Sequence, residues 1–273
     1  MTDQEVSKFI FRLFMDTENL LHLEDEIKAL FALCANDTEY AVMKHILQNL
    51  KLVGPKSYRL LLTQMATRIS EIAGNGAKLA IVASAFDHTP DGSQALLHRL
   101  KSRLAGQKNI GFFNSVPNYL RQMDQFHRYL LIDDFCGTGK TLKSRMQAIG
   151  NDSKQKGIAL DGQALVLAGM ERALLAMRDD GVAADFIYEC KAGISGHFGE
   201  VQATEYIQAM IRIEQELLAI VDGVPVPSLG YGEAEALFAI QDDNAPNSNF
   251  PVLWWHKDRY ANNRKTVLTR YEQ

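Results

Sequence analysis

Short apolar runs, each bounded by polar or glycine-rich turns, recur through the middle of this 273-residue chain. Uninterrupted apolar runs of this kind are typical of strands that are buried on both faces of a sheet. Stretches with helical periodicity lie between them, so the pattern predicts an open, mostly parallel α/β sheet flanked by helices. The predicted strands are 78–86, 109–114, 128–132, 163–168 and 184–189, and the predicted helices between them are 94–104, 116–123, 141–150 and 172–178.

The first 75 residues carry the helical period instead. Apolar side chains recur at three- and four-residue spacing over 6–14 and again over 27–33. Asn36-Asp37-Thr38 is a candidate break and N-cap before a helix over 41–52, and Ser57 can cap a helix that runs to Ile72. We therefore predict an N-terminal helical region over 1–75 and an α/β core over 76–222, which ends in a long amphipathic helix from about residue 200.

Residues 223–273 depart from the rhythm of strands and helices. A turn-rich segment, DDNAPNSN, runs into Phe250–Trp255 (FPVLWW), an apolar cluster too large to be exposed on a soluble monomer. The pattern predicts a hairpin-like lid that forms a hood with the N-terminal helices over the carboxyl edge of the sheet. Asn244 and Asn247 are expected to face the ligand site from this hood. The alternative is that the segment is only a C-terminal hairpin that fills the core.

The segment Tyr129–Thr141 (YLLIDDFCGTGKT) carries the chemistry. It resembles the ribose-phosphate loop of type I phosphoribosyltransferases: an apolar strand, two acids, three variable residues, then T-G-x-T. The resemblance implies that Asp133 and Asp134 act as catalytic residues, which accept hydrogen bonds from ribose hydroxyls or act indirectly on a Mg²⁺ ion held with phosphoribosyl pyrophosphate. The residues expected to bind the ribose phosphate at the start of the next helix are Gly137, Thr138, Gly139, Lys140 and Thr141.

Gly139-Lys140-Thr141 also ends like a Walker A loop, which is the nearest competing motif. That loop requires a glycine five residues before Gly139, and this chain has Asp134 there. A carboxylate in a triphosphate cradle would be repulsive, which excludes the P-loop ATPase. The remaining alternative is an acidic, glycine-rich turn without a ligand.

A second loop follows the first core strand, at Ser84–Ser93 (SAFDHTPDGS). In the type I phosphoribosyltransferase fold this loop holds the pyrophosphate, so the resemblance implies contacts from Ser84, Asp87 and Ser93. The alternative is a connecting loop whose helix is capped by Asp91 or Ser93.

The resemblance is narrower than the fold. The string IDDFCGTGKT and the distal LGYGEAEALFAIQDDNAPNSNFPVLWW are similar to the phosphoribosyltransferase-like family of bacterial conflict systems, PRTase-CE. That likeness implies an effector or toxin in anti-phage defence, with partners such as a retron reverse transcriptase and its non-coding RNA or another defence-operon protein. Purine-salvage enzymes place an acid immediately before the T-G, where it is the general base, and this chain has Gly137 there. Transfer to a free nucleobase therefore does not follow.

Two hypotheses on function remain open. In the first, the site makes or breaks a bond at the anomeric carbon of phosphoribosyl pyrophosphate or a nucleotide. In the second, it is a non-catalytic module that senses a nucleotide and gates a partner protein or nucleic acid.

The net charge of −4, with four basic residues in the first 50, disfavours a DNA-binding module. Three scattered cysteines and the lack of an apolar span favour a cytoplasmic protein without membrane contact.

Overall fold

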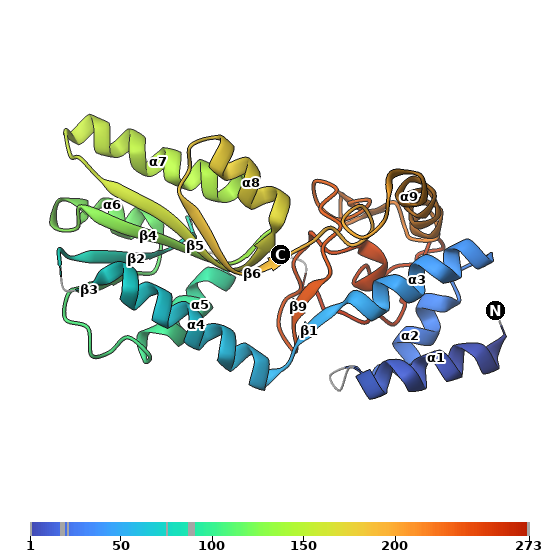
Figure 1. The fold of residues 1–273 in the computed structure, drawn as a ribbon. Coiled ribbons are helices and arrows are strands. Elements are labelled where there is room, and N and C mark those ends of the chain that lie inside the picture. The colour runs from blue at the N-terminus through green and yellow to red at the C-terminus, as the bar shows by residue number, and fades with distance from the viewer. Residues whose placement is uncertain (1, 17–19, 21, 75, 87–90, 272–273) are drawn as a thin grey trace. The chain divides into compact units, whose positions relative to one another are not determined.

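The computed structural model describes residues 2–16, 20, 22–74, 76–86 and 91–271 (Figure 1). The chain divides into two compact units, Met1–Pro55 with Cys190–Gln273 and Lys56–Glu189. We call the first the helical unit and the second the sheet unit. The predicted boundaries lay at 75/76 and 222/223, whereas the units divide at 55/56 and 189/190.

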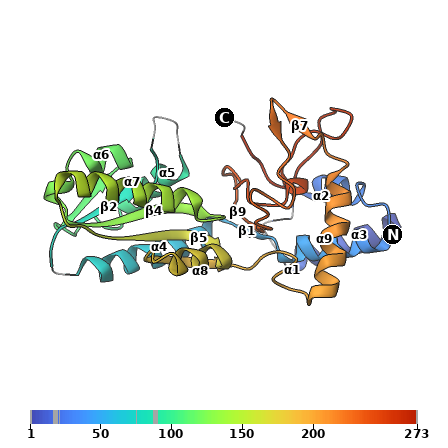
Figure 2. The same cartoon turned by 90° about the horizontal axis from the view of Figure 1, so that it is seen from above.

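The sheet unit contains the five predicted strands. Their order is β3-β2-β4-β5-β6, and the pairs β2–β3, β2–β4 and β4–β5 are parallel. Figure 2 shows β2, β4 and β5 side by side. The predicted α/β class is confirmed. The strands are β2 (Leu79–Ala83), β3 (Ile110–Phe113), β4 (Arg128–Cys136), β5 (Asp161–Met170) and β6 (Ala184–Cys190).

Helices cover both faces of this sheet, with α4 and α5 on one face and α6, α7 and α8 on the other (Figure 1). The predicted N-cap at Ser57 is wrong, because α4 already begins at Pro55. Asp91 caps α5 and its carboxylate accepts a hydrogen bond from the Ser93 amide. The helices are α4 (Pro55–Ala73), α5 (Gly92–Lys101), α6 (Val116–Leu120), α7 (Lys140–Lys156) and α8 (Glu171–Asp179), with a short 3-10 helix at Met123–Gln125.

The strand β4 is longer than its apolar run predicts. The expected end was residue 132, but pairing with β5 continues through Phe135↔Ala168 and Cys136↔Gly169. The carboxylates of Asp133 and Asp134 therefore extend from the last residues of a central strand, and only residues 137–139 connect it to α7.

The helical unit joins the N-terminal helices to the C-terminal segment. Its two-stranded sheet pairs β1 with β9 in parallel, a contact that the sequence did not predict. The predicted helix from residue 200 ends at Glu214, before the hairpin β7–β8. The elements are α1 (Asp3–Asp16), α2 (Glu24–Phe31), α3 (Asp37–Asn49), β1 (Lys51–Val53), α9 (Glu200–Glu214), β7 (Ile220–Val221), β8 (Val224–Pro225), β9 (Phe238–Ile240) and the 3-10 helix η3 (Pro251–Leu253).

The FPVLWW segment lies in the core of the helical unit and not in a hairpin. Phe250, Trp254 and Trp255 are each at most 5% exposed. The two indole N–H groups donate to the carbonyl oxygens of Asn249 and Leu218, each at 3.0 Å. The segment therefore forms no hairpin, and its burial agrees with the core-filling part of the alternative. Whether the unit forms a hood over the sheet stays a prediction.

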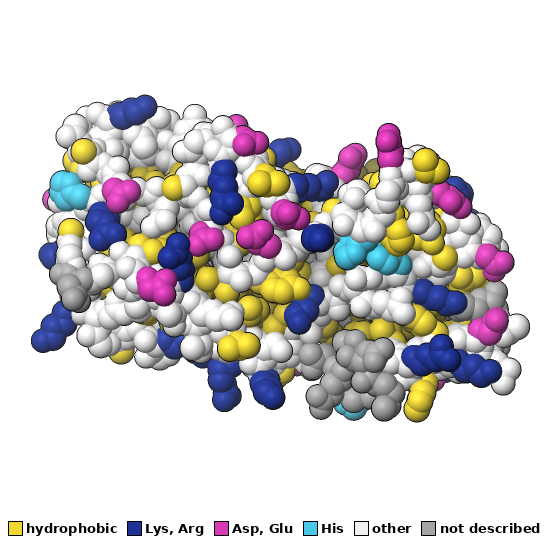
Figure 3. Space-filling view, in the orientation of Figure 1, with side chains coloured by type: hydrophobic (Ala, Val, Ile, Leu, Met, Phe, Trp, Pro, Cys, Tyr) yellow, Lys and Arg dark blue, Asp and Glu magenta, His cyan; other side chains and the backbone are white. Residues whose placement is uncertain are grey.

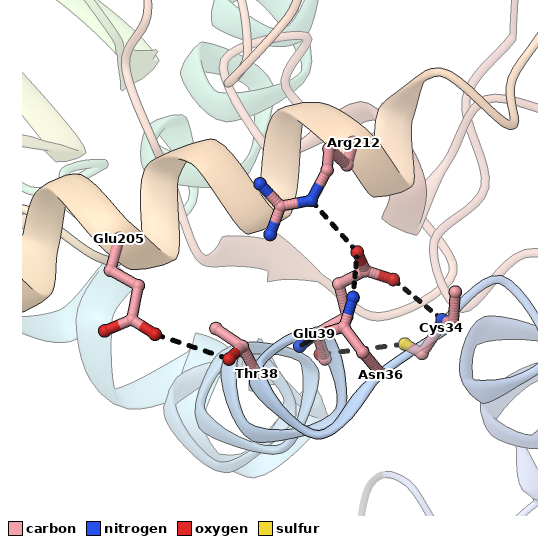
Figure 4. Close-up of polar contacts among 7 residues, drawn as sticks. Cys34, Asn36, Thr38, Glu39, Glu205 and Arg212 are labelled. Carbon is pink, nitrogen blue, oxygen red and sulfur yellow. Dashed lines mark hydrogen bonds and ion pairs between the residues drawn. The ribbon is translucent and has the colours of Figure 1, made fainter.

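Asn36 caps α3, as predicted, and its side chain accepts from the amide of Glu39. The buried Glu39 carboxylate returns the contact: it accepts from the Ala35 amide at 2.7 Å and from Nδ2 of Asn36 at 2.8 Å. Nε of Arg212 donates to it across the α3–α9 contact at 3.2 Å (Figure 4). This reciprocal cap fixes where α3 begins and which side of it meets α9.

The face shown in Figure 3 agrees with the small net charge of the chain, −4. Figure 3 shows basic and acidic side chains interspersed over the visible face, with no broad basic region among the residues that it colours. In the part of the chain that the structure describes, no helix combines the length and apolar character needed to cross a bilayer.

Candidate functional site

The strand order places the candidate site at the boundary between β2 and β4. The chain leaves β2 toward β3 on one side and returns to β4 on the other, so the direction of winding reverses there. In open α/β sheets the crevice outside the carboxyl ends of two such strands is where ligands bind. The Ser84 amide donates to the Ile132 carbonyl at 3.0 Å, which holds the two strand ends together. Both loops predicted from the sequence leave the sheet at this boundary.

Asp133 lies at the end of β4 and is only 9% exposed. Its Oδ1 accepts the amide of Asp134 at 3.0 Å. Burial raises the pKa of the Asp133 carboxyl well above its usual value, the charges of Asp134 and then Asp91 raise it further, and a hydrogen bond from Ser84 offsets part of this. The edge of the sheet thus carries negative charge that no basic partner of Asp133 neutralises in the part of the chain that the structure describes.

Asp134 projects from β4 onto the start of α5. A Cβ built on Gly92 would lie 2.6 Å from Cγ of Asp134, so a larger residue there would force this carboxylate to move. The second acid of the predicted pair therefore joins the two loops. Nothing in the sequence pattern marked Gly92 beyond its place in a turn.

The start of α7 is open to an anion. Its N-cap is Gly139, which adopts a left-handed conformation with φ of 76°, and no side chain caps the helix. Thr138 Oγ1 accepts the Lys140 amide at a long 3.5 Å, and the first turn contains no acid. Among the described residues, the amides of Thr141 and Leu142 find no acceptor. Such free amides, aligned with the helix dipole, are an anion-binding arrangement.

Gly139 is required by the fold as well as by any ligand. A Cβ built there would lie 3.0 Å from Cγ of Met177 on α8. Its φ is positive, whereas that of Gly137 is not, and a side chain added at position 139 would meet α8. Cys136, just before the loop, is buried, and burial raises the pKa of its thiol to about 12. The thiol therefore stays protonated.

The two ends of the loop after β2 are held by contacts within the protein. Ser93 is fully buried and its hydroxyl accepts the amide of Ala85 at 3.2 Å. The Ser84 carbonyl accepts Nε of Arg145 at 3.2 Å, and the Arg145 guanidinium lies 4.5 Å from the Phe86 ring centre. Arg145 thus links α7 to this loop, a role that nothing in the sequence pattern indicated. Asp87 lies outside the described residues.

The two hood asparagines have local partners in the helical unit. Oδ1 of Asn244 accepts the Tyr271 amide at 3.0 Å, and the carbonyl of Asn247 accepts the Tyr231 amide at 2.9 Å. Their approach to the ribose-phosphate loop stays a prediction. The buried Asn249 was missed: its side chain accepts the Phe238 amide and donates to the Phe238 and Pro246 carbonyls, each at 2.9 Å.

The acids at the β2–β4 boundary could supply only part of the ligand shell of a Mg²⁺ ion. Within the described ranges, no group of three His, Cys, Asp or Glu side chains is arranged to hold a metal ion. Mg²⁺ is commonly held by one or two carboxylates together with ligand phosphates. The concentrated negative charge around Asp133 and Asp134 fits such a shared site, in which the ligand supplies the remaining oxygens.

Known proteins resemble this chain in sequence and, loosely, in fold. The PRTase-CE family model matches residues 34–270. An orotate phosphoribosyltransferase from Aeropyrum pernix is 18% identical with a TM-score of 0.34, over 49% of this chain and 71% of that one. A xanthine-guanine-hypoxanthine phosphoribosyltransferase from Helicobacter pylori is 11% identical with a TM-score of 0.35, over 51% and 86%. Superpositions this loose say nothing about activity. No curated protein matches the chain.

Asp133→Asn is expected to raise the melting temperature near pH 8. A raised pKa in the folded state means that the proton on Asp133 contributes stability at low pH, and that this contribution is lost as the pH rises through the folded pKa. Asparagine is never ionised, so the gain should shrink toward zero as the pH falls to about 4, near the pKa of an unfolded aspartate. Melting curves from pH 4 to 8 check this, with the exposed Asp124→Asn as control. A difference in melting temperature between Asp133→Asn and the wild type that does not change with pH would contradict this expectation.

Gly139→Ala and Gly150→Ala, at the start and within α7, should have opposite effects. Alanine at position 139 must adopt the left-handed region and approach Met177, at a cost of about 1–2 kcal/mol. A Cβ at position 150 meets nothing within 4 Å, so alanine there should stabilise the helix by roughly 0.5–1 kcal/mol. Urea unfolding measures both, and equal effects would contradict the assigned conformations.

Proposed function

The chain belongs to the PRTase-CE family, and on that premise we propose that it binds a ribose phosphate, from phosphoribosyl pyrophosphate or a nucleotide, where β2 and β4 end. One observation carries the proposal: the paired acids Asp133-Asp134 are followed within five residues by a helix whose first amides are uncapped. The phosphate would accept hydrogen bonds from the amides at the start of α7 and from Thr138. The ribose hydroxyls would donate to Asp134, the more exposed of the two acids.

The expected chemistry is at the anomeric carbon. The bond from C1 to a base or to pyrophosphate would break or form through a transition state with positive charge on the ribose, which a carboxylate next to the ring stabilises. Asp134 would take that role, while the buried Asp133 holds the Asp134 amide through its Oδ1. Mg²⁺, when bound with the ligand, would neutralise phosphate charge. We place this activity in anti-phage defence, as an effector that consumes nucleotides beside a retron or another defence-operon partner.

Gly137 favours a second candidate function. A general base for an incoming nucleobase would stand immediately before Thr138, where Gly137 has no side chain. The same pocket could then sense a nucleotide and gate a partner without chemistry. The two candidates differ in one readout: incubation with nucleoside monophosphates followed by chromatography. Release of free base supports the enzyme, and recovery of intact nucleotide after saturating binding supports the sensor.

Thr138→Ala should weaken ribose 5-phosphate binding. A lost hydrogen bond to a charged group costs about 1.5–3 kcal/mol, which is roughly a 10- to 100-fold loss of affinity. Calorimetric titration of the full chain measures this, with Thr63→Ala as a matched control, because the Thr63 hydroxyl only contacts the Arg59 carbonyl of its own helix.

The double variant Asp133→Asn with Asp134→Asn should abolish binding while the protein stays folded. Unchanged affinity in that variant, or equal losses in Thr138→Ala and Thr63→Ala, would contradict the proposed site.

A further inference from the structure

The strand β3 is the last strand on one side of the five-stranded sheet (Figure 1). The Leu79 amide donates to the Asn109 carbonyl at 2.9 Å, and the register pairs Leu79 with Ile110. Because alternate residues of a strand turn their backbone groups to the same side, Gly111 bonds toward β2, and the amide and carbonyl of Phe112 point to the open edge. Among the described residues, these two Phe112 groups have no hydrogen-bond partner. The edge therefore offers backbone groups to a further strand.

A groove of about 340 Å³ lies along this edge. One wall contains Asn118 and Phe126, whose ring lies so close to Gly111 that a Cβ there would be 2.5 Å from it. The other wall, on the opposite face of β3, contains Phe112 and Lys101, with Nζ of Lys101 5.9 Å from the centre of the Phe112 ring. Since successive side chains of a strand point to opposite faces, a chain paired with Phe112 would direct alternate side chains to the two walls. The groove thus has the form of a site for strand addition.

The segment that forms this edge is basic. Residues 92–123, which contain α5, β3 and α6, carry five Lys or Arg and no Asp or Glu, although the net charge of the whole chain is −4. Acidic residues bound the segment at Asp91 and Asp124. Such a concentration of positive charge attracts an anionic partner and repels a second copy of the same edge. The five basic residues are Arg99, Lys101, Arg103, Lys108 and Arg121.

We propose that the β3 edge docks an extended acidic segment of a partner protein, which adds a strand to the sheet. Acidic side chains of that segment face Lys101, and the alternate, apolar side chains face Phe126. Lysines on an open edge prevent pairing between copies of a protein, but they do not prevent pairing with a strand of opposite charge. A nucleic acid would match the charge, but it has no peptide groups to pair with Phe112. The edge is separated from β4 by β2, so the inference does not depend on the proposed ribose-phosphate site.

Fluorescence polarisation with the full chain tests this with three labelled probes: a peptide of alternating glutamate and valine, its lysine–valine counterpart and a single-stranded oligothymidylate. We expect the glutamate–valine peptide to bind at least about tenfold more tightly than either of the others. Tighter binding of another probe, or no binding of any peptide, would overturn the acidic partner.

Two N-methylated versions of the glutamate–valine peptide separate strand addition from charge attraction alone. A strand paired along one edge uses the amides of alternate residues, so methylation of all glutamates and of all valines should have unequal effects, and one of the two should lose about tenfold or more. Equal effects of the two methylations would overturn strand addition.

Lys101→Glu identifies the charge responsible. The variant should weaken binding of the glutamate–valine peptide about tenfold or more and strengthen binding of the lysine–valine peptide. Lys191→Glu is the matched control: it makes the same change at an exposed residue directly after β6, the strand at the other end of the sheet, and should alter neither affinity. Melting curves show whether both variants fold, and the methylated peptides test the wild-type protein in either case. Equal losses in the two variants would overturn the role of Lys101.

Discussion

The parallel pairing of β2 with β4 is the constraint on which the site depends. Because the strands run in the same direction, their carboxyl ends reach one edge, and the register brings Ala83 opposite Ile132. The amide of Ser84 then bonds to Ile132, so the loop after β2 starts beside Asp133. Residues about 50 positions apart in the chain thus come together through backbone pairing. Indeed the acids repel one another, and the sheet holds them in place.

This arrangement of acids lowers the stability of the fold, which a loop with only a structural role would have no reason to do. A buried carboxyl beside two further acids is less stable than an amide of the same shape, since its charge is neither solvated nor paired. Gly92 and Gly139 have no side chains that could pack at the starts of α5 and α7. A side chain at Gly92 would meet Asp134, and one at Gly139 would meet Met177. Strained or destabilising groups that persist together at a strand edge are typical of binding and catalytic sites.

Local patterns predicted much of this, and non-local packing determined the rest. The five strands followed from apolar runs between turns, and the phosphate loop from its acid, glycine and hydroxyl spacing. The end of β4 was missed because two aspartates suggest a loop, whereas pairing of Phe135 with Ala168 extends the strand. The β1–β9 pair joins segments some 190 residues apart, and no local pattern reports such a contact. The aromatic FPVLWW segment was apolar enough to predict burial, but not to distinguish a lid from a core.

A crystal structure of the full chain with ribose 5-phosphate is the most direct test of the central claim. The account predicts the phosphate at the start of α7, with its oxygens about 2.7–3.2 Å from amides within residues 138–142 and the ribose hydroxyls beside Asp134. Well-defined ligand density anywhere else, with an empty first turn of α7, would contradict the assignment of this site.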